Sequence, residues 1–342
     1  MTDIWTRIES EERPILLYGT GNGADKILTE LDRIGVKING VFASSGFVRE
    51  RYFHGFKVLS LDEAENQFED FVALFSFGSS RPEVLENIKS IMSRHTLVVP
   101  EVPVCGDEIF NLEFARKHAR ELQRVYELLC DEKSKQVFEN IVRFKLMGDI
   151  SLLFDCETPE DEAFENILKL KSGDSFLDLG AYNGDTVLDF VKRVDSFGKI
   201  VAVEPDRKTF LKLTKNTEAL NIECINAAVG KECGTLPFSV KGSRGSVVGG
   251  DNLIEAINID TLAEKNKFDY IKFDVEGNEL DAIIGGEKTI KNDRPKMLIS
   301  AYHKGEDLFT IPLKVHEFFP DYKIYIRHYP SVPAWDTNFY FI

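Results

Sequence analysis

The stretch Asp178-Leu179-Gly180-Ala181-Tyr182-Asn183-Gly184-Asp185-Thr186 closes an apolar run at residues 175–179 and opens a helical pattern. Glycines at 180 and 184 let the backbone turn sharply and approach a ligand, because glycine has no Cβ atom. Asp178 is placed to meet a cationic group on that ligand. A strand, a tight turn and a helix are therefore predicted, with a binding site at the carboxyl edge of a sheet.

A carboxylate stands at the end of the next predicted strand, residues 199–204, where Glu204 is followed by Pro205. At that position a carboxylate can accept both hydroxyls of a ribose. The third strand ends in Asn226-Ala227-Ala228-Val229, whose small side chains leave room for an adenine ring. The alternative is that the glycines merely shape a turn and that Glu204 caps a helix.

Strands and helices alternate through the C-terminal half. Apolar runs predict strands at residues 175–179, 199–204, 223–229, 270–275, 297–301, 322–327 and 338–341. Because the last two runs follow each other closely, they should form an antiparallel pair. A Rossmann-like sheet of seven strands with this ending is typical of the class I methyltransferase fold.

A smaller α/β pattern precedes this half. Strands are predicted at residues 15–18, 36–43, 71–77 and 97–99, with amphipathic segments between them. We expect a smaller Rossmann-like α/β domain over residues 1–105, a helical connector over 106–167 and the main domain over 168–342. The charged connector helices would cover one domain, or form a homodimer interface, which the sequence leaves open.

The first strand of the small domain is followed by Gly19, Gly21 and Gly23, which suggests an NAD(P)-dependent sugar-nucleotide oxidoreductase. However, the second strand ends at Ala43-Ser44 without a carboxylate for a ribose. NAD is therefore disfavoured. The loop at residues 19–23 would bind a nucleotide-linked sugar, or the domain would serve assembly.

Six motifs in the C-terminal half carry a family resemblance. They lie at residues 176–186, 203–206, 259–262, 271–280, 302–312 and 327–329. Together they resemble the FkbM family of methyltransferases, in the bacterial branch often found among surface-glycan genes. The resemblance covers residues 143–342 and departs at Asp336-Thr337, where the family usually has Glu-Thr.

The resemblance implies S-adenosylmethionine (SAM) as methyl donor and an acceptor hydroxyl, typically on a sugar, nucleotide-sugar or glycan precursor. We expect an O-methyltransferase whose cofactor contacts are Asp178, Gly180, Ala181, Tyr182, Gly184, Asp185, Thr186, Glu204, Pro205, Asn226, Ala227 and Asp274. A non-catalytic glycan-binding protein is the remaining alternative. The presence of both Gly180 and Glu204 disfavours this alternative, because a non-catalytic glycan-binding protein needs no carboxylate for a ribose.

Catalysis requires a group that removes the acceptor proton. His303, directly after the fifth strand, is the first choice, while Asp274 and Glu276 would hold the substrate or orient His303. A divalent metal held by these three residues is an alternative that the sequence does not favour. Lys272 would pair with Asp274 or contact the acceptor.

Other acceptor contacts are expected from His328 and from the Gly-rich and Ser-rich segment 241–250, which contains Arg244 and Ser246. That segment is either a lid over the acceptor or an ordinary flexible loop.

The composition excludes some partners. A net charge of −15 and a pI of about 5.0 oppose binding to nucleic acid. Neither a membrane span nor an N-terminal leader is evident, because no apolar run approaches the roughly 20 residues required. An odd number of cysteines, five, suits free thiols in a reducing compartment, so we expect a cytoplasmic protein.

Overall fold

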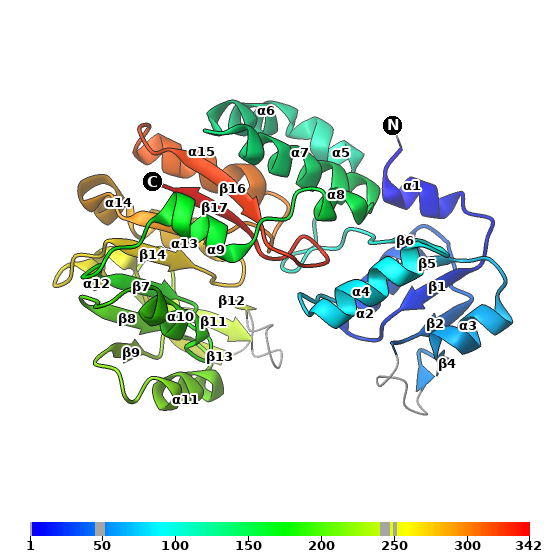
Figure 1. Ribbon diagram of the computed structural model, residues 1–342, viewed down its shortest axis with the longest axis horizontal. Coiled ribbons are helices and arrows are strands. Elements are labelled where there is room, and N and C mark those ends of the chain that lie inside the picture. Colours follow the sequence, from blue (N-terminus) through cyan, green and yellow to red (C-terminus); the bar gives the residue numbers. More distant parts are fainter. Residues whose placement is uncertain (1, 45–51, 240–246, 249–251) are drawn as a thin grey trace.

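The structure, a computed structural model, describes residues 2–44, 52–239, 247–248 and 252–342. Two α/β units lie at opposite ends of the molecule, and a group of helices spans them on one side (Figure 1). The largest hydrophobic core includes residues of both sheets and of the intervening helices, among them Phe75, Phe144 and Ile299. The units are therefore joined by a continuous apolar interior.

The first unit is built on a six-stranded sheet with the order β3-β4-β2-β1-β5-β6. Its strands are β1 (Ile15–Tyr18), β2 (Gly40–Phe42), β3 (Tyr52–Phe53), β4 (Phe56–Leu59), β5 (Val72–Phe75) and β6 (Thr96–Val98). Its helices are α1 (Ile4–Glu9), α2 (Asn22–Arg33), α3 (Leu61–Gln67) and α4 (Pro82–Met92). Strand β1 is buried along its whole length, which explains its unbroken apolar sequence.

The second predicted strand of this unit, residues 36–43, is shorter than expected. Pairing with β1 begins only at Gly40, because the backbone N–H of Ile15 donates to the Asn39 side chain over 2.8 Å. An asparagine side chain that bonds to the backbone in this way competes with strand pairing.

Helices fill the interval between the two sheets: α5 (Leu112–Lys117), α6 (Ala119–Leu128), α7 (Glu132–Met147), α8 (Ser151–Phe154), α9 (Glu160–Ala163) and the π-helical turn η1 (Phe164–Leu168). Helix α7 packs on the C-terminal sheet, where Arg327 donates to Asp131 over 2.6 Å and to Ser134 over 2.7 Å. Because Arg327 is buried, these two hydrogen bonds hold the N-terminal end of α7 against the second unit.

The second unit contains a seven-stranded sheet with the order β16-β17-β15-β14-β7-β8-β9. The strands are β7 (Phe176–Leu179), β8 (Ile200–Val203), β9 (Glu223–Ile225), β14 (Tyr270–Phe273), β15 (Lys296–Ser300), β16 (Ile324–His328) and β17 (Thr337–Phe341). Only β17 runs antiparallel to its neighbours β15 and β16. The antiparallel ending expected from the sequence is therefore present.

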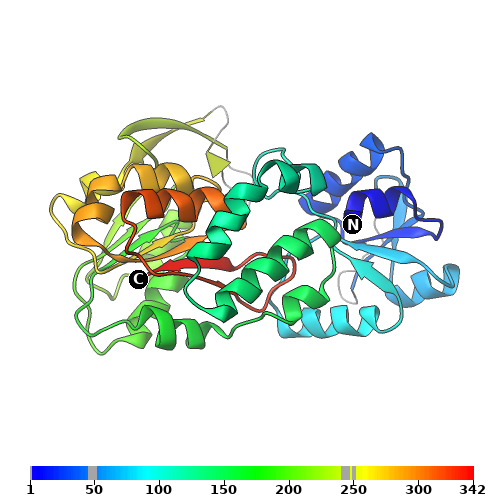
Figure 2. The same cartoon turned by 90° about the horizontal axis from the view of Figure 1, so that it is seen from above.

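Helices cover both faces of this sheet (Figure 2). They are α10 (Asp185–Arg193), α11 (Arg207–Asn216), α12 (Ile259–Ala263), α13 (Glu279–Ile284), α14 (Glu287–Asp293) and α15 (Asp307–Phe318). The carboxyl ends of β7, β8, β14 and β15 are left facing the first unit.

The predicted strand at residues 223–229 is wrong as a single element. It divides into β9 and β10 (Ala228–Val229), and β10 joins a separate four-stranded sheet with β11 (Gly234–Ser239), β12 (Val247–Val248) and β13 (Asn252–Ile257). The break falls at Asn226, whose side-chain amide donates to the carbonyls of Glu204 and Pro205 over 2.8 and 2.9 Å. The four-stranded sheet was not expected from the sequence.

No helix in the described part of the chain is long and apolar enough to span a bilayer. All five cysteines are free, and Cys130 and Cys233 are exposed. The division of the chain into a small domain (1–105), a connector (106–167) and a main domain (168–342) stays a prediction.

Candidate functional site

A cavity of about 820 Å³ lies at the carboxyl ends of β7, β8, β14 and β15, on the side that faces the first unit. Gly180, Glu204 and Asp274 line it from the second unit. Gly78, Ser79 and Ser80 line it from the first unit. Its size is in the range of small-molecule sites, and its position at the carboxyl edge is where parallel α/β sheets bind ligands.

The glycine-rich turn after β7 contains two glycines with positive φ, and Tyr182 between them has φ +46°. Gly180 has φ +82°, and a Cβ atom there would lie 1.8 Å from the carbonyl oxygen of Asp274. Gly184 has φ +87° and forms the N-cap of α10. Gly180 is therefore needed for the close approach of the β7 and β14 loops, which places Tyr182 and Asp185 along the cavity.

Glu204, at the end of β8, is a buried carboxylate that lines the cavity. Its oxygens accept hydrogen bonds from the backbone N–H groups of Tyr182 (2.9 Å) and Asp206 (2.8 Å). These bonds fix the carboxylate and leave further lone pairs for a ligand. Burial raises the pKa of Glu204 to about 7, although the two backbone hydrogen bonds lower it.

The expected adenine contacts need a correction. Asn226 uses its side-chain amide to hold the backbone of residues 204 and 205, and Ala227 is buried; neither lines the cavity. The wall is formed instead by Ala228 and Val229, the next two residues. The sequence indicated the segment, but the bend at Asn226 decides which side chains face the cavity.

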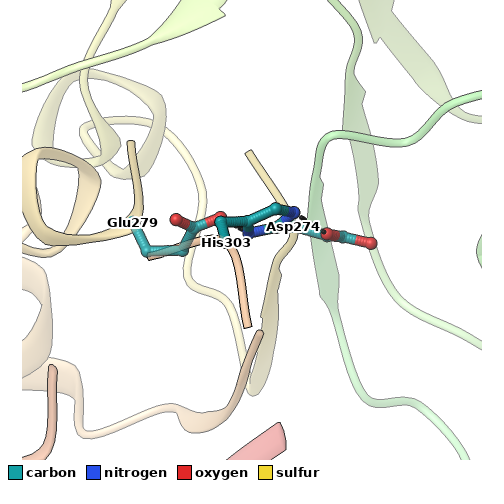
Figure 3. A group of neighbouring side chains, drawn as sticks. All are labelled: Asp274, Glu279 and His303. Carbon is teal, nitrogen blue, oxygen red and sulfur yellow. Dashed lines mark ion pairs between the residues drawn. The ribbon is translucent and has the colours of Figure 1, made fainter. Parts of the chain in front are cut away.

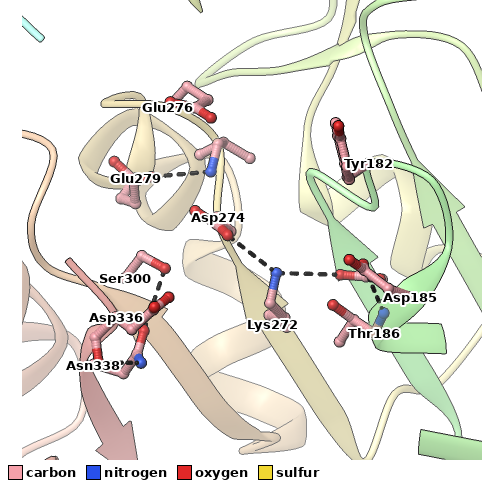
Figure 4. Close-up of polar contacts among 12 residues, drawn as sticks. Tyr182, Asp185, Thr186, Lys272, Asp274, Glu276, Glu279, Ser300, Asp336 and Asn338 are labelled. Carbon is pink, nitrogen blue, oxygen red and sulfur yellow. Dashed lines mark hydrogen bonds and ion pairs between the residues drawn. The ribbon is translucent and has the colours of Figure 1, made fainter. Parts of the chain in front are cut away.

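Lys272, on β14, forms ion pairs with two carboxylates, and Figure 4 shows the one with Asp274. Its Nζ atom lies 3.4 Å from Asp274 and 3.8 Å from Asp178. Asp178 is fully buried, does not line the cavity, and has no hydrogen-bond partner among the described residues. Burial raises its pKa to about 6, against the opposing effect of Lys272. Asp178 therefore meets the cation of Lys272 rather than facing a ligand directly.

His303 is fully buried, and carboxylates flank both of its ring nitrogens (Figure 3). Nδ1 lies 3.0 Å from Glu279, while Nε2 lies 3.6 Å from Asp274 and 3.5 Å from Glu276. Burial by itself lowers the pKa of His303, but these carboxylates, led by Glu279, raise it to about 10. The ring is therefore an imidazolium at neutral pH, and it does not line the cavity.

Asp274, Glu279 and His303 also lie close enough together to be tested as a metal site. A single ion would need one ring nitrogen of His303, whereas the carboxylates lie on opposite sides of the ring. A protonated imidazole can form an ion pair on both sides at once, because its positive charge is shared by both nitrogens. The geometry thus favours an ion-pair network over a metal centre.

Glu276 faces the cavity from the loop after β14, opposite Tyr182 (Figure 4). It has φ +54°, a conformation that non-glycine residues rarely adopt. Burial raises its pKa to about 7, while His303 lowers it. A carboxylate with a pKa near neutrality is suited to take up a proton at physiological pH.

Tyr302, which the sequence reasoning missed, also lines the cavity, and its hydroxyl donates to Asp274 over 3.1 Å. Although burial raises the pKa of Asp274, Lys272 and His303 hold it below the usual range. The position of Tyr302 directly after the fifth strand was the available signal. Ser300, Asn338 and Glu279 were missed as well.

The remaining predicted residues divide into three groups. Tyr182, Asp185, Thr186 and Pro205 line the cavity, and their contact with a cofactor stays a prediction, whereas Ala181 is buried and does not line it. His328 is buried, lies 3.0 Å from Thr337 through Nδ1, and does not line the cavity. Burial lowers its pKa to about 4. Arg244 and Ser246 lie outside the described residues.

Two of the three glycines after β1 serve packing. A Cβ atom at Gly19 would lie 2.6 Å from Phe77 and Ser76, and one at Gly23 would lie 2.3 Å from the carbonyl oxygen of Ser76. A Cβ atom at Gly21 would meet nothing within 4 Å. Close packing against the segment after β5 therefore explains Gly19 and Gly23 without a bound dinucleotide.

Comparison with known proteins places this geometry in context. Residues 178–328 match the family model described as methyltransferase FkbM domain. The fold is similar to the crystal structure of a methyltransferase FkbM from Methylobacillus flagellatus KT, with a TM-score of 0.72 at 20% identity, over 99% of this chain and 92% of that one. A SAM-dependent methyltransferase from Aquifex aeolicus overlaps only loosely, with a TM-score of 0.32 at 16% identity over 56% of this chain and 97% of that one. A search of curated protein sequences found no match.

Proposed function

We propose that this protein, whose residues 178–328 form a methyltransferase domain of the FkbM type, is a SAM-dependent O-methyltransferase acting on a hydroxyl of a sugar or glycan precursor. One observation carries the proposal. A single cavity brings together Glu204, a fixed carboxylate suited to a ribose, and Glu276, a carboxylate suited to accept a proton.

The residues present fit SAM as the donor. Glu204 would accept the ribose hydroxyls, and Ala228 and Val229 would contact the adenine. When bound, SAM supplies an electrophilic methyl group on a positively charged sulfur. Most charged groups in the described lining are carboxylates, which complements that charge: Glu160, Asp185, Asp189, Glu204, Asp206, Asp274, Glu276 and Asp336.

Proton removal is assigned to Glu276 rather than to His303. The carboxylates around His303 raise its pKa to about 10, so the ring is already protonated at neutral pH, and it does not line the cavity. His303 instead acts as a positioning residue, because its positive charge lowers the pKa of both Glu276 and Asp274. Glu276 takes the proton from the acceptor hydroxyl during methyl transfer.

An uncharged acceptor is supported by other residues that line the same cavity as Glu276. Ser300, Tyr302 and Asn338 present hydroxyl and amide groups, which suit the hydroxyls of a sugar. Lys272 is the one cation in the described lining, and it is paired with two carboxylates. The lining therefore offers no unpaired cation among the described residues to bind a phosphate or carboxylate of the acceptor.

Calorimetry with S-adenosylhomocysteine (SAH), with NAD in parallel, tests the donor assignment. Loss of the Glu204 carboxylate in Glu204→Ala should weaken SAH binding by about 1–3 kcal/mol, the range for a charged hydrogen bond. The control is Glu223→Ala, an exposed carboxylate on the neighbouring strand β9. Tight binding of NAD without binding of SAH would overturn the proposal.

Transfer of a labelled methyl group to sugar acceptors tests the catalytic assignment. Glu276→Gln should lower kcat by about 10² to 10⁴-fold, as for loss of a general base. SAH affinity should stay unchanged in this variant, since Glu276 is assigned to the acceptor. Full turnover in Glu276→Gln would remove Glu276 from the mechanism.

A further inference from the structure

The first unit supplies part of the wall of the cavity. Residues 78–80, in the segment between β5 and α4, line it together with the loop between β16 and β17. The two segments are joined by a pair of backbone hydrogen bonds between Ser79 and Val332, of 2.9 and 3.0 Å. In Figure 1 the red loop between β16 and β17 reaches toward the first unit. The cavity is therefore incomplete without the first unit.

An exposed aromatic ring stands at this junction. Trp335 lines the cavity and keeps 39% of its surface exposed, although it sits on the backbone of Gly78. A Cβ atom at Gly78 would lie 2.0 Å from Cζ3 of the indole. The absence of a side chain at Gly78 thus allows the indole to pack directly on the backbone. The remaining ring surface is open to a ligand.

The residues that line the cavity around Trp335 on the side of the first unit carry no charge. Gly78, Ser79 and Ser80 lie there with Ser331 and Trp335, and the nearest charged lining residues in sequence are acidic, such as Asp336. No lysine, arginine or histidine of the described residues lines this end. An indole face attracts polarised C–H groups, and serine hydroxyls can donate or accept hydrogen bonds.

The first unit is also tied to the catalytic loops. The backbone N–H of Cys105 donates to the carbonyl of His303 over 2.9 Å, and its thiol donates to the carbonyl of Glu276 over 3.2 Å. A Cβ atom at Gly277 would lie 3.0 Å from Cβ of Cys105. The chain that leaves the first sheet is therefore packed against the loop that carries Glu276, which fixes the position of the first unit relative to the site.

We infer that Trp335, seated on Gly78 and flanked by Ser79 and Ser80, forms a subsite for a neutral sugar ring of the acceptor. This inference rests on the proposed function and extends it. The ring would stack on the indole while the reacting hydroxyl lies at Glu276. The small N-terminal unit then serves acceptor recognition, and a phosphorylated or nucleotide-linked sugar is not the ligand of this subsite.

Tryptophan fluorescence gives a direct test, because the chain has two tryptophans and Trp5 is buried in the first unit. In Trp5→Phe, Trp335 is the single reporter. The probes are neutral methyl hexosides and hexose disaccharides, with the matching hexose phosphates, each raised to its solubility limit. At least one neutral sugar should give a saturable change, and its phosphate should bind more weakly.

Variants separate stacking from a structural effect. Trp335→Phe should retain sugar binding in calorimetry, whereas Trp335→Ala should weaken it by about three- to tenfold, on the scale of a lost stacking contact. Gly78→Ala should displace the indole and weaken binding. The control Gly21→Ala should not, because a Cβ atom there meets nothing within 4 Å.

The result that would overturn the inference is the absence of any response to the neutral sugars, or stronger binding of the phosphates. SAH calorimetry on the same proteins keeps the two proposals apart. Trp335→Ala should bind SAH as the unsubstituted protein does. If SAH fails to bind any of them while Trp335 still responds to sugars, the donor proposal fails and the subsite remains.

Discussion

The Nδ1 atom of His303 lies 3.0 Å from Oε1 of Glu279, and both side chains are fully buried. His303 is thereby held as an imidazolium, whose other nitrogen faces Asp274 and Glu276. A buried charge placed among three carboxylates controls how readily each of them accepts a proton. The behaviour of the site with pH follows from this relationship.

Replacement of His303 by glutamine should move the pH dependence of methyl transfer. The positive charge that lowers the pKa of Glu276 is lost, so this pKa should rise above about 7 and the rising limb of the rate should shift to higher pH. At pH 7 the rate should fall about tenfold for each unit of that rise. The control is His316→Gln on α15. An unchanged profile in His303→Gln would contradict the positioning role.

Chelation should leave the enzyme active. Both nitrogens of His303 face carboxylates, so the charge of the imidazolium takes the place that a metal cation would have among them. The check is the initial rate of methyl transfer before and after dialysis against EDTA, with added magnesium or manganese as a comparison. Loss of activity that either metal restores would establish Asp274, Glu279 and His303 as a metal site.

SAH should bind more tightly as the pH rises from about 5.5 to 8, a window set by the raised pKa of Glu204, about 7. Below this pKa the carboxyl is protonated and accepts ribose hydroxyls less well, so binding should release a proton. Calorimetry in two buffers of different ionisation enthalpy measures that proton. Glu204→Gln should bind weakly with a flatter pH dependence. Equal proton release in this variant would assign the titration to another group.

Two glycines with similar backbone angles provide a matched test of the turn after β7. Gly180 has φ +82° with the Asp274 carbonyl in the place of a Cβ atom, whereas Gly173 has φ +91° with open space around it. Gly173→Ala should cost about 1–2 kcal/mol of folding stability from the backbone alone. Gly180→Ala should cost more and should weaken SAH binding, as chemical denaturation and calorimetry would show. Equal costs would mean that the close approach is unimportant.

Local sequence patterns predicted the mixed α/β class because strand, turn and helix signals are contained in short segments. The apolar run of β1 and the turn around Gly180 are examples. The prediction failed at residues 223–229, where the apolar pattern continues but Asn226 bends the chain through hydrogen bonds to residues distant in sequence. Hydrophobic periodicity carries no information about such a bend.

The sequence by itself determined the α/β architecture and the match to the FkbM methyltransferase domain model over residues 178–328. The glycine turn, Glu204 and Asp274 could be read from it because each follows its strand directly. The tertiary structure alone decided which side chains face the cavity. It turned His303 away from the cavity and toward Glu279, and it brought Gly78 beneath Trp335. The physical reason is that burial and charge depend on neighbours from distant segments, whereas the end of a strand is fixed by the strand itself.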